Sequence, residues 1–293
     1  MMLFEILQKK EGFSHTEELI ADYILANPES FKNKSARDIG KELFVNSSTL
    51  TRMCQKLGFD GFSDFRNAYF DEKKYLDSNF KQIDPNIPFV KNDSCYQIAN
   101  KIGTLYEEII KDCELLIDYK MLEEVVNLID KSRVIYVVSQ GLHINLARIF
   151  LEKMSWIGKT VSITSHSDVS YHNASNAKQD EIFILVSYSG ETNGVVKIAK
   201  KLKQLNMPFV AITSFGTNSL SHLSDYVLYI STREKITSGI GNYSSYISVQ
   251  YLFDVIYSCI FKKKYDENLD KKQRNSKDFQ DRRFTNNPIL KDD

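Results

Sequence analysis

The segment from Arg133 to about residue 262 alternates short apolar runs with longer stretches of helical pattern. Short apolar runs bounded by turn residues are typical of buried strands. Because parallel strands are joined by crossover connections that are usually helices, this alternation predicts a parallel sheet with helices on both faces. The expected strands are 134–139, 160–164, 182–187, 209–213 and 226–230, and the expected helices are 141–157, 191–205 and 244–261. This part of the chain is therefore expected to form a three-layer α/β sandwich around a five-stranded parallel sheet.

The first 75 residues carry helix signals and no strand pattern. Ser14 and Glu17 have the spacing of a capping box, and the helix that they start is expected to stop at Pro28. Another helix start is expected at Ser35, and a later one after Ser63. The sequence therefore predicts an all-α N-terminal domain.

Residues 36–57 have the pattern of a helix-turn-helix, with a turn at 44–46. The second helix of this pair places an apolar stripe on one face and polar side chains on the others. The stripe consists of Leu50, Met53, Cys54 and Leu57. Arg, Gln, Ser and Thr are residue types that hydrogen-bond base edges and phosphates. We expect the DNA-facing residues to be Ser35, Ser47, Ser48, Thr49, Thr51, Arg52, Gln55 and Lys56.

Local charge favours a double-stranded DNA partner. The whole chain has 38 basic and 38 acidic residues, so its net charge gives no indication of nucleic acid. Residues 31–58, however, contain six basic and two acidic residues, which are Lys32, Lys34, Arg37, Lys41, Arg52 and Lys56 against Asp38 and Glu42. Positive charge is thus concentrated where DNA would dock. The alternative is a helical dimerisation domain whose third helix has a solvated polar face.

A polar loop follows the predicted strand 182–187 and contains Ser187, Ser189, Gly190 and Thr192. Glycine lets the backbone approach a ligand, a helix start offers unpaired N–H groups, and hydroxyls add neutral donors. The loop lacks the lysine of a nucleotide phosphate loop, which favours a sugar phosphate over a nucleoside triphosphate. The alternative is an ordinary polar loop that caps a helix.

Other residue types narrow the class of protein further. The four cysteines lie far apart, which favours structural thiols in a reducing cytoplasm. The sequence has no signal peptide and no apolar run of membrane-spanning length, so it predicts a soluble cytoplasmic protein with no membrane partner. His143, His166 and His172 match no compact ligand spacing, and we expect neither a metal site nor a cofactor.

Composition also suggests the domain boundaries. Residues 77–94 are polar, contain two prolines and lack periodicity, as is typical of a linker. The segment after residue 262 is dense in charge and poor in apolar periodicity, as is typical of a mobile tail. We therefore expect a helix-turn-helix domain at 1–76, a linker at 77–94, an effector domain at 95–262 and a mobile tail at 263–293.

Two blocks of the sequence carry a family resemblance. The stretches Glu17–Pro28 and Thr49–Phe62, the latter containing Arg-Met-Cys-Gln-Lys-Leu-Gly-Phe-Asp-Gly-Phe, resemble the N-terminal domain of RpiR-type transcriptional regulators. The region from about 115 to 262 resembles their C-terminal sugar isomerase (SIS) domain, with 187–192 as the phosphosugar loop. The resemblance implies a homodimeric or homotetrameric regulator of sugar or amino-sugar metabolism whose affinity for a DNA operator responds to a phosphosugar effector.

The resemblance also implies the residues of the phosphosugar site, which come from two loops. They are Gln140, Gly141, His143, Ser187, Tyr188, Ser189, Gly190 and Thr192. This chain departs from the family pattern where Ser139 replaces a glycine and His143 replaces a phosphate-facing serine. Tyr246 likewise stands where the family has an arginine. A histidine at position 143 can hydrogen-bond a phosphate, or it can fill the pocket and change its ligand.

Two function classes follow from these patterns. The first is a ligand-responsive DNA-binding regulator with no catalytic residues. The second is a sugar-phosphate isomerase with a helical N-terminal appendage, in which Glu191 or Glu234 would act as general base. An isomerase has no need of a basic reading helix, so residues 31–58 favour the regulator.

Overall fold

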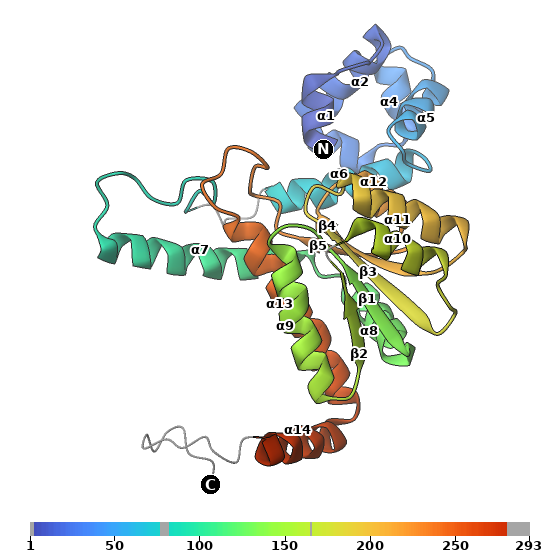
Figure 1. Ribbon diagram of the computed structural model, residues 1–293. Helices are drawn as coiled ribbons and strands as arrows, with labels where there is room; N and C mark the ends of the chain where they lie inside the picture. Colours follow the sequence, from blue (N-terminus) through green and yellow to red (C-terminus); the bar gives the residue numbers. More distant parts are fainter. Residues whose placement is uncertain (1–2, 77–81, 165, 280–293) are drawn as a thin grey trace.

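The computed structural model describes residues 3–76, 82–164 and 166–279, which form a helical N-terminal unit and an α/β C-terminal unit (Figure 1). The N-terminal helices are α1 (Leu3–Lys9), α2 (His15–Ala26), α3 (Pro28–Asn33), α4 (Ala36–Glu42), α5 (Ser47–Lys56) and α6 (Phe62–Leu76). The capping box expected at Ser14 and the helix start expected at Ser35 are present, and Ser35 also forms a capping box. The prediction of an all-α N-terminal region is therefore confirmed.

Two of these helices, α1 and α3, were not predicted. The start of α1 is fastened to α6, because the carboxylate of Glu72 accepts the N–H groups of Leu3 and Phe4, each at 2.6 Å. These are helix-start donors without a partner inside their own helix. Glu72 is far away in the sequence, so no local pattern reveals this contact. Pro28, expected only to end α2, is also the first residue of α3, where its missing N–H is tolerated.

The turn between α4 and α5 depends on a glycine. A Cβ atom on Gly40 would lie 2.8 Å from the carbonyl oxygen of Val45 and 3.3 Å from the backbone nitrogen of Ser47. A larger residue would therefore push α4 away from the start of α5. The predicted apolar stripe of α5 faces the core, with Leu50 and Met53 each 1 % exposed. The helix-turn-helix predicted from the sequence has formed.

The C-terminal unit contains a five-stranded sheet with the strand order β2-β1-β3-β4-β5. Its strands are β1 (Val134–Val138), β2 (Thr160–Ile163), β3 (Glu181–Ser187), β4 (Phe209–Ser214) and β5 (Tyr226–Ile230). Every neighbouring pair is parallel. The central strand β3 is buried along its whole length, as expected where helices cover both faces. The predicted fold class is confirmed.

Helices cover the two faces of this sheet separately. They are α7 (Cys95–Leu116), α8 (Tyr119–Lys131), α9 (His143–Trp156), α10 (Ser167–Ser175), α11 (Asn193–Gln204), α12 (Ser219–Leu223) and α13 (Tyr243–Lys263). The apolar faces of α8, α9 and α13 share one core cluster with the sheet, and those of α10, α11 and α12 share another. The short α12 and the connecting α10 were not predicted. Figure 1 shows α7 against α13 and extending away from the sheet.

The charged C-terminal segment contains a further helix, α14 (Tyr265–Phe279). This helix was not predicted, and the expectation that residues 263–293 form a mobile tail stays a prediction. Asn268 donates a hydrogen bond to the carbonyl oxygen of Phe261 at 2.9 Å, and Lys271 pairs with Glu267 one turn away at 2.6 Å. Such spaced charge pairs support a helix that lacks a broad apolar face. Residues 77–81 of the expected linker and 280–293 of the expected tail lie outside the described residues.

Candidate effector pocket and DNA-reading face

A pocket of about 230 Å³ opens at the carboxyl end of β3, where the loop 187–192 leads into α11. Ligands of parallel α/β sheets bind at this edge of the sheet. The helix α9 also begins here, so two helix N-termini with partial positive charge adjoin the pocket. The lining residues are Gln140, His143, Val186, Ser187, Tyr188, Ser189, Thr192, Glu234, Lys235, Ile236, Asn242 and Ser245.

The hydroxyl groups of the loop are held in place by the loop itself. The Oγ of Ser187 lies 2.7 Å from the Oγ1 of Thr192, and it also accepts the N–H of Thr192 at 3.4 Å. The Oγ of Ser189 accepts the N–H of Glu191 at 3.2 Å. The three hydroxyls thus have fixed positions without a ligand, which lowers the entropy that an anion would have to remove on binding.

Gly190 lets the loop approach the start of α12. Its φ angle is +68°, and a Cβ atom there would lie 1.9 Å from the side-chain oxygen of Asn218. The N–H of Leu220 donates to the carbonyl oxygen of Gly190 at 3.1 Å, and the N–H of Ser219 donates to Glu191 at 2.7 Å. No side chain can occupy position 190 unless Asn218 moves. The glycine at this position is therefore a requirement of packing as well as of backbone conformation.

Two polar atoms of other lining residues have no hydrogen-bond partner among the described residues. They are Nε2 of His143 and Oε1 of Glu234, and both are buried. Burial lowers the pKa of His143 below its ordinary value, so the ring is neutral at neutral pH. Burial also raises the pKa of Glu234, although the N–H of Ser245, which donates to Oε2 at 3.2 Å, opposes this change. Unpaired buried polar atoms are costly, and a hydroxylated ligand in this pocket would supply their partners.

Tyr188 joins the loop to the wall that carries Glu234. Its hydroxyl donates to the carbonyl oxygen of Glu234 at 2.6 Å and accepts the N–H of the same residue at 3.0 Å. Burial raises the pKa of Tyr188 far above its ordinary value, so the hydroxyl keeps its proton. The ring therefore positions residue 234 and has no hydroxyl proton free for a ligand.

The structure brings six of the eight expected phosphosugar residues into the pocket lining. These are Gln140, His143, Ser187, Tyr188, Ser189 and Thr192, whereas Gly141 and Gly190 shape the loops behind it. The segment 234–245 contributes lining residues that the sequence did not indicate, apart from Glu234, which was considered as a base. Among them Lys235 is the one basic residue of the described lining. The sequence signal that could have indicated Lys235 is a basic residue shortly after the fifth predicted strand, 226–230.

The reading face of α5 presents some of the expected residues more openly than others. Ser48, Arg52 and Gln55 are exposed, whereas Ser47, Thr49 and Thr51 are half-buried. The hydroxyl of Thr51 donates to the carbonyl oxygen of Ser47 at 3.3 Å, a bond inside the helix. Ser48, Arg52 and Gln55 are therefore the residues of α5 most available to base edges.

Ser35 and Lys56 are already engaged within the N-terminal unit. The hydroxyl of Ser35 donates to Asp38 at 2.6 Å and caps α4. The ammonium of Lys56 donates to the carbonyl oxygen of Gly12 at 2.8 Å and pairs with Glu17 at 2.9 Å. To contact DNA, each of them would have to share or exchange a partner.

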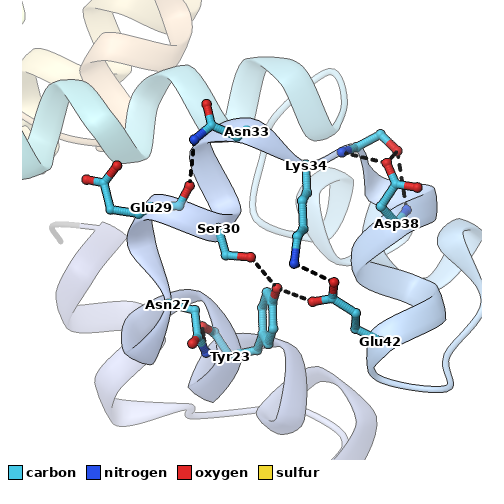
Figure 2. Close-up of polar contacts among 9 residues, drawn as sticks. Tyr23, Asn27, Glu29, Ser30, Asn33, Lys34, Asp38 and Glu42 are labelled. Carbon is cyan, nitrogen blue, oxygen red and sulfur yellow. Dashed lines mark hydrogen bonds and ion pairs between the residues drawn. The ribbon is translucent and has the colours of Figure 1, made fainter.

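Lys34 is also paired, and Figure 2 shows it in a network with Tyr23 and Glu42. The hydroxyl of Tyr23 donates to Glu42 at 2.5 Å and lies 2.8 Å from the hydroxyl of Ser30. Lys34, and after it Tyr23, lowers the pKa of Glu42 below its ordinary value. Within the described residues, Arg37, Lys41 and Arg52 form no ion pair. Positive charge that is free to meet phosphate is thus concentrated at α4 and α5.

The described residues contain no group of three or more His, Cys, Asp or Glu side chains that could hold a metal ion. None of the described helices is both long and apolar enough to cross a membrane.

The fold and the two surfaces define a class of protein with a helix-turn-helix unit followed by a sugar isomerase-type α/β unit. Residues 1–73 match the family model described as a helix-turn-helix domain of the rpiR family, and residues 128–258 match the SIS domain model. An uncharacterized HTH-type transcriptional regulator of Clostridium perfringens is 30% identical over 92% of this chain and 96% of its own. Another, from Haemophilus influenzae, is 28% identical over 90% of this chain and 91% of its own.

A solved structure shares the fold of the whole chain. The NanR protein of Vibrio vulnificus, complexed with ManNAc-6P, superposes with a TM-score of 0.61 at 23% identity, covering 97% of this chain and 100% of that one. The chain belongs to the RpiR family of HTH-type transcriptional regulators that carry a SIS domain.

Proposed function

We propose that this protein is a transcriptional regulator that binds a double-stranded DNA operator through α5. Its affinity for the operator changes when a phosphosugar occupies the pocket beside loop 187–192. The observation that carries the effector half is the pocket itself. Its lining combines the pre-positioned hydroxyls of the loop with the unpaired buried atoms of His143 and Glu234. The phosphate would lie against the hydroxyls and Lys235, and the sugar against His143 and Glu234. The relative solved with ManNAc-6P makes phosphorylated amino sugars the first ligands to test.

The DNA half of the proposal rests on the exposed residues of α5 and the free cations of α4. Arg52 and Gln55 are suited to guanine and adenine edges, and Ser48 to a base or phosphate. Arg37 and Lys41 would contact backbone phosphates, because the first helix of such a motif crosses the DNA backbone. Ser35, Ser47, Thr49, Thr51 and Lys56 are proposed as supporting contacts.

We also propose a homodimer or homotetramer. One α5 helix reads only a short half-site, so specificity needs two copies on a pseudo-palindrome with half-sites about 34–36 Å apart, or a multiple of that spacing. In this scheme residues 1–76 bind DNA, 95–262 bind effector, and 77–94 connect them in a protein that acts in the cytoplasm. Footprinting tests the symmetry, since one short unsymmetrical protected site would contradict it.

A sugar-phosphate isomerase is the second candidate, and one observation favours it. Glu234 is a buried carboxylate with a raised pKa and a free oxygen at the sugar end of the pocket, as a general base requires. The basic helix-turn-helix unit favours regulation without catalysis.

Thermal unfolding of the full chain with a panel of hexose, pentose and amino-sugar phosphates tests the effector half. A ligand that binds only the folded protein raises its apparent stability. Retention of the protein on duplex DNA at increasing salt tests the other half, because phosphate contacts make affinity fall with salt. Turnover of any stabilising sugar phosphate, combined with no affinity for duplex DNA, would instead establish the isomerase.

A further inference from the structure

The segment that leads out of the N-terminal unit is fastened to the wall of the effector pocket. Residues 82–88 come soon after α6, and they lie beside the loop 231–242 that follows β5 (Figure 1). The same loop supplies Glu234, Lys235 and Ile236 to the pocket lining. One stretch of chain thus faces the proposed effector on one side and the connection to the DNA-binding unit on the other.

Arg233 makes the charged part of this attachment. Its guanidinium pairs with Glu108 of α7 at 2.8 Å and donates to the carbonyl oxygen of Ile83 at 2.8 Å. The other carboxylate oxygen of Glu108 accepts the N–H of Gln82 at 3.0 Å. The Arg233 and Glu108 side chains are only 11 % and 7 % exposed. A buried charge pair with two further hydrogen bonds to one segment holds that segment in a defined place.

Asn86 makes the uncharged hydrogen bonds of this attachment. Its side-chain oxygen accepts the N–H of Lys235 at 2.7 Å, and its side-chain nitrogen donates to the carbonyl oxygen of Arg233 at 3.4 Å. Its own carbonyl oxygen accepts the N–H of Ile240 at 2.9 Å. Lys235 therefore lines the pocket and at the same time donates its backbone N–H to Asn86.

The loop is also bonded to the phosphosugar loop through Tyr188, whose hydroxyl holds both backbone groups of Glu234. Residues 233–235 are therefore bonded to Tyr188 on one side and to residues 83 and 86 on the other. Any ligand that moves or orders Glu234 and Lys235 acts on groups that are directly bonded to the connecting segment.

We propose that Arg233, Glu108 and Asn86 form a linker clamp, which transmits occupation of the pocket to the DNA-binding unit by fixing residues 82–88. This inference rests on the proposed function, since it needs a phosphosugar in the pocket. An effector changes DNA affinity only if it binds two states of the protein with different affinity, and in this proposal those states differ in whether the clamp holds residues 82–88.

Hydrogen exchange on the full chain tests the clamp, with N-acetylmannosamine 6-phosphate, glucosamine 6-phosphate and inorganic phosphate as probes. The variant Asn86→Ala removes two side-chain bonds to the loop, and Asn92→Ala is the matched control, because Asn92 is exposed on the same segment. Arg233→Lys is a second variant that keeps the charge but loses the forked geometry. Thermal unfolding of each variant confirms that it folds.

In the parent and in Asn92→Ala, a bound probe should slow exchange both at 187–192 and at 82–90. In Asn86→Ala and Arg233→Lys it should slow exchange at 187–192 alone. The effect of that probe on DNA affinity, about 5–150-fold for typical allosteric pairs, should fall to near onefold in both variants. Persistence of the response at 82–90 in either variant, or its absence in a parent that responds at 187–192, would overturn the clamp. No response at 187–192 to any probe in the parent would instead contradict the proposed function and remove the premise of the clamp.

Discussion

On α5 the residues expected to meet bases, Ser48, Arg52 and Gln55, are exposed, whereas in the pocket Ser187 is 2% exposed and Glu234 7%. The side chains of these three α5 residues form no hydrogen bond or ion pair among the described residues. Those of the pocket are held by the loop hydroxyl pair, by the contact between Gly190 and Asn218, and by Tyr188.

This difference separates two ways of binding an anion. On the proposed DNA face the charges would act in water, so the affinity for DNA should depend strongly on salt and tolerate changes in its surroundings. In the proposed effector pocket the donors are held in place, so the affinity for a phosphosugar should depend on geometry. Substitutions that disturb packing should therefore affect the pocket more than α5.

The largest effect is expected from Gly190→Ala. The new Cβ would lie 1.9 Å from Asn218, and the residue has a positive φ of +68°, so both overpacking and backbone strain oppose the change. Together these should lower the free energy of unfolding by about 3 kcal/mol or more and abolish phosphosugar binding. Denaturant unfolding and calorimetry give the two measurements.

Gly141→Ala is the control for that substitution. Gly141 has a similar φ of +60°, but a Cβ there would meet no atom within 4 Å. Its cost should therefore be limited to the backbone, about 1–2 kcal/mol. Equal losses in the two variants would mean that the contact with Asn218 is unimportant.

Ser189→Ala should have the next largest effect. A hydrogen bond to a charged group contributes about 1.5–3 kcal/mol, so loss of this hydroxyl should weaken phosphosugar binding roughly tenfold or more. DNA binding without effector should be unchanged, because Ser189 lies outside the helix-turn-helix unit. Calorimetry with a phosphosugar found by thermal screening measures the change, and Ser155→Ala, on the exposed end of α9, is the control. Unchanged affinity would mean that the phosphate binds elsewhere in the protein.

Arg52→Ala tests the exposed surface. If Arg52 contacts a base edge in each half-site of a symmetric operator, its loss should reduce discrimination between operator and random duplex by about 1–3 kcal/mol per half-site. Fluorescence anisotropy on a duplex selected with the parent protein gives the ratio, and Arg148→Ala on α9 is a control of equal charge. A ratio that is the same in all three proteins would remove Arg52 from the reading face.

The sequence predicted those features that depend on short-range pattern. The capping box at Ser14, the helix start at Ser35, the stripe on α5 and all five strands follow from local spacing, and the structure contains them. The features that were missed depend on partners far along the chain. Glu72 of α6 accepts the N–H of Leu3 at the start of α1. Asn218, in a different loop, lies so close to residue 190 that only glycine fits there.

The pocket wall shows the same limit. The loop that carries Lys235 has no helix or strand periodicity, and it reaches the pocket only because Tyr188 and Asn86 hold its backbone. The family pattern predicted the serines and threonine of the phosphosugar loop, together with Gln140 and His143 of the other loop, but it gave no indication of Lys235 and Ile236.

The smallest predicted effect concerns the pH dependence of the pocket in the absence of ligand. Burial lowers the pKa of His143 from its ordinary 6.5. Below pH 6.5 the unfolded chain therefore takes up a proton that the folded protein does not, and the free energy of unfolding falls as the pH falls toward the folded-state pKa. The loss cannot exceed about 1.4 kcal/mol per pH unit.

His143→Gln isolates this contribution, because it removes the titrating ring and keeps a polar side chain. Glu234, whose pKa is raised by burial, acts in the opposite direction as the pH falls toward 4.5, so the parent alone would show a mixture of the two effects. The difference between parent and variant cancels Glu234 and should grow as the pH is lowered from about 7 to about 5. Denaturant unfolding across that range measures it, with His172→Gln, at an exposed site, as the control. A difference that stays constant with pH would mean that His143 accepts its proton as readily in the folded pocket as in water, and the neutral ring assigned to the sugar end would have to be abandoned.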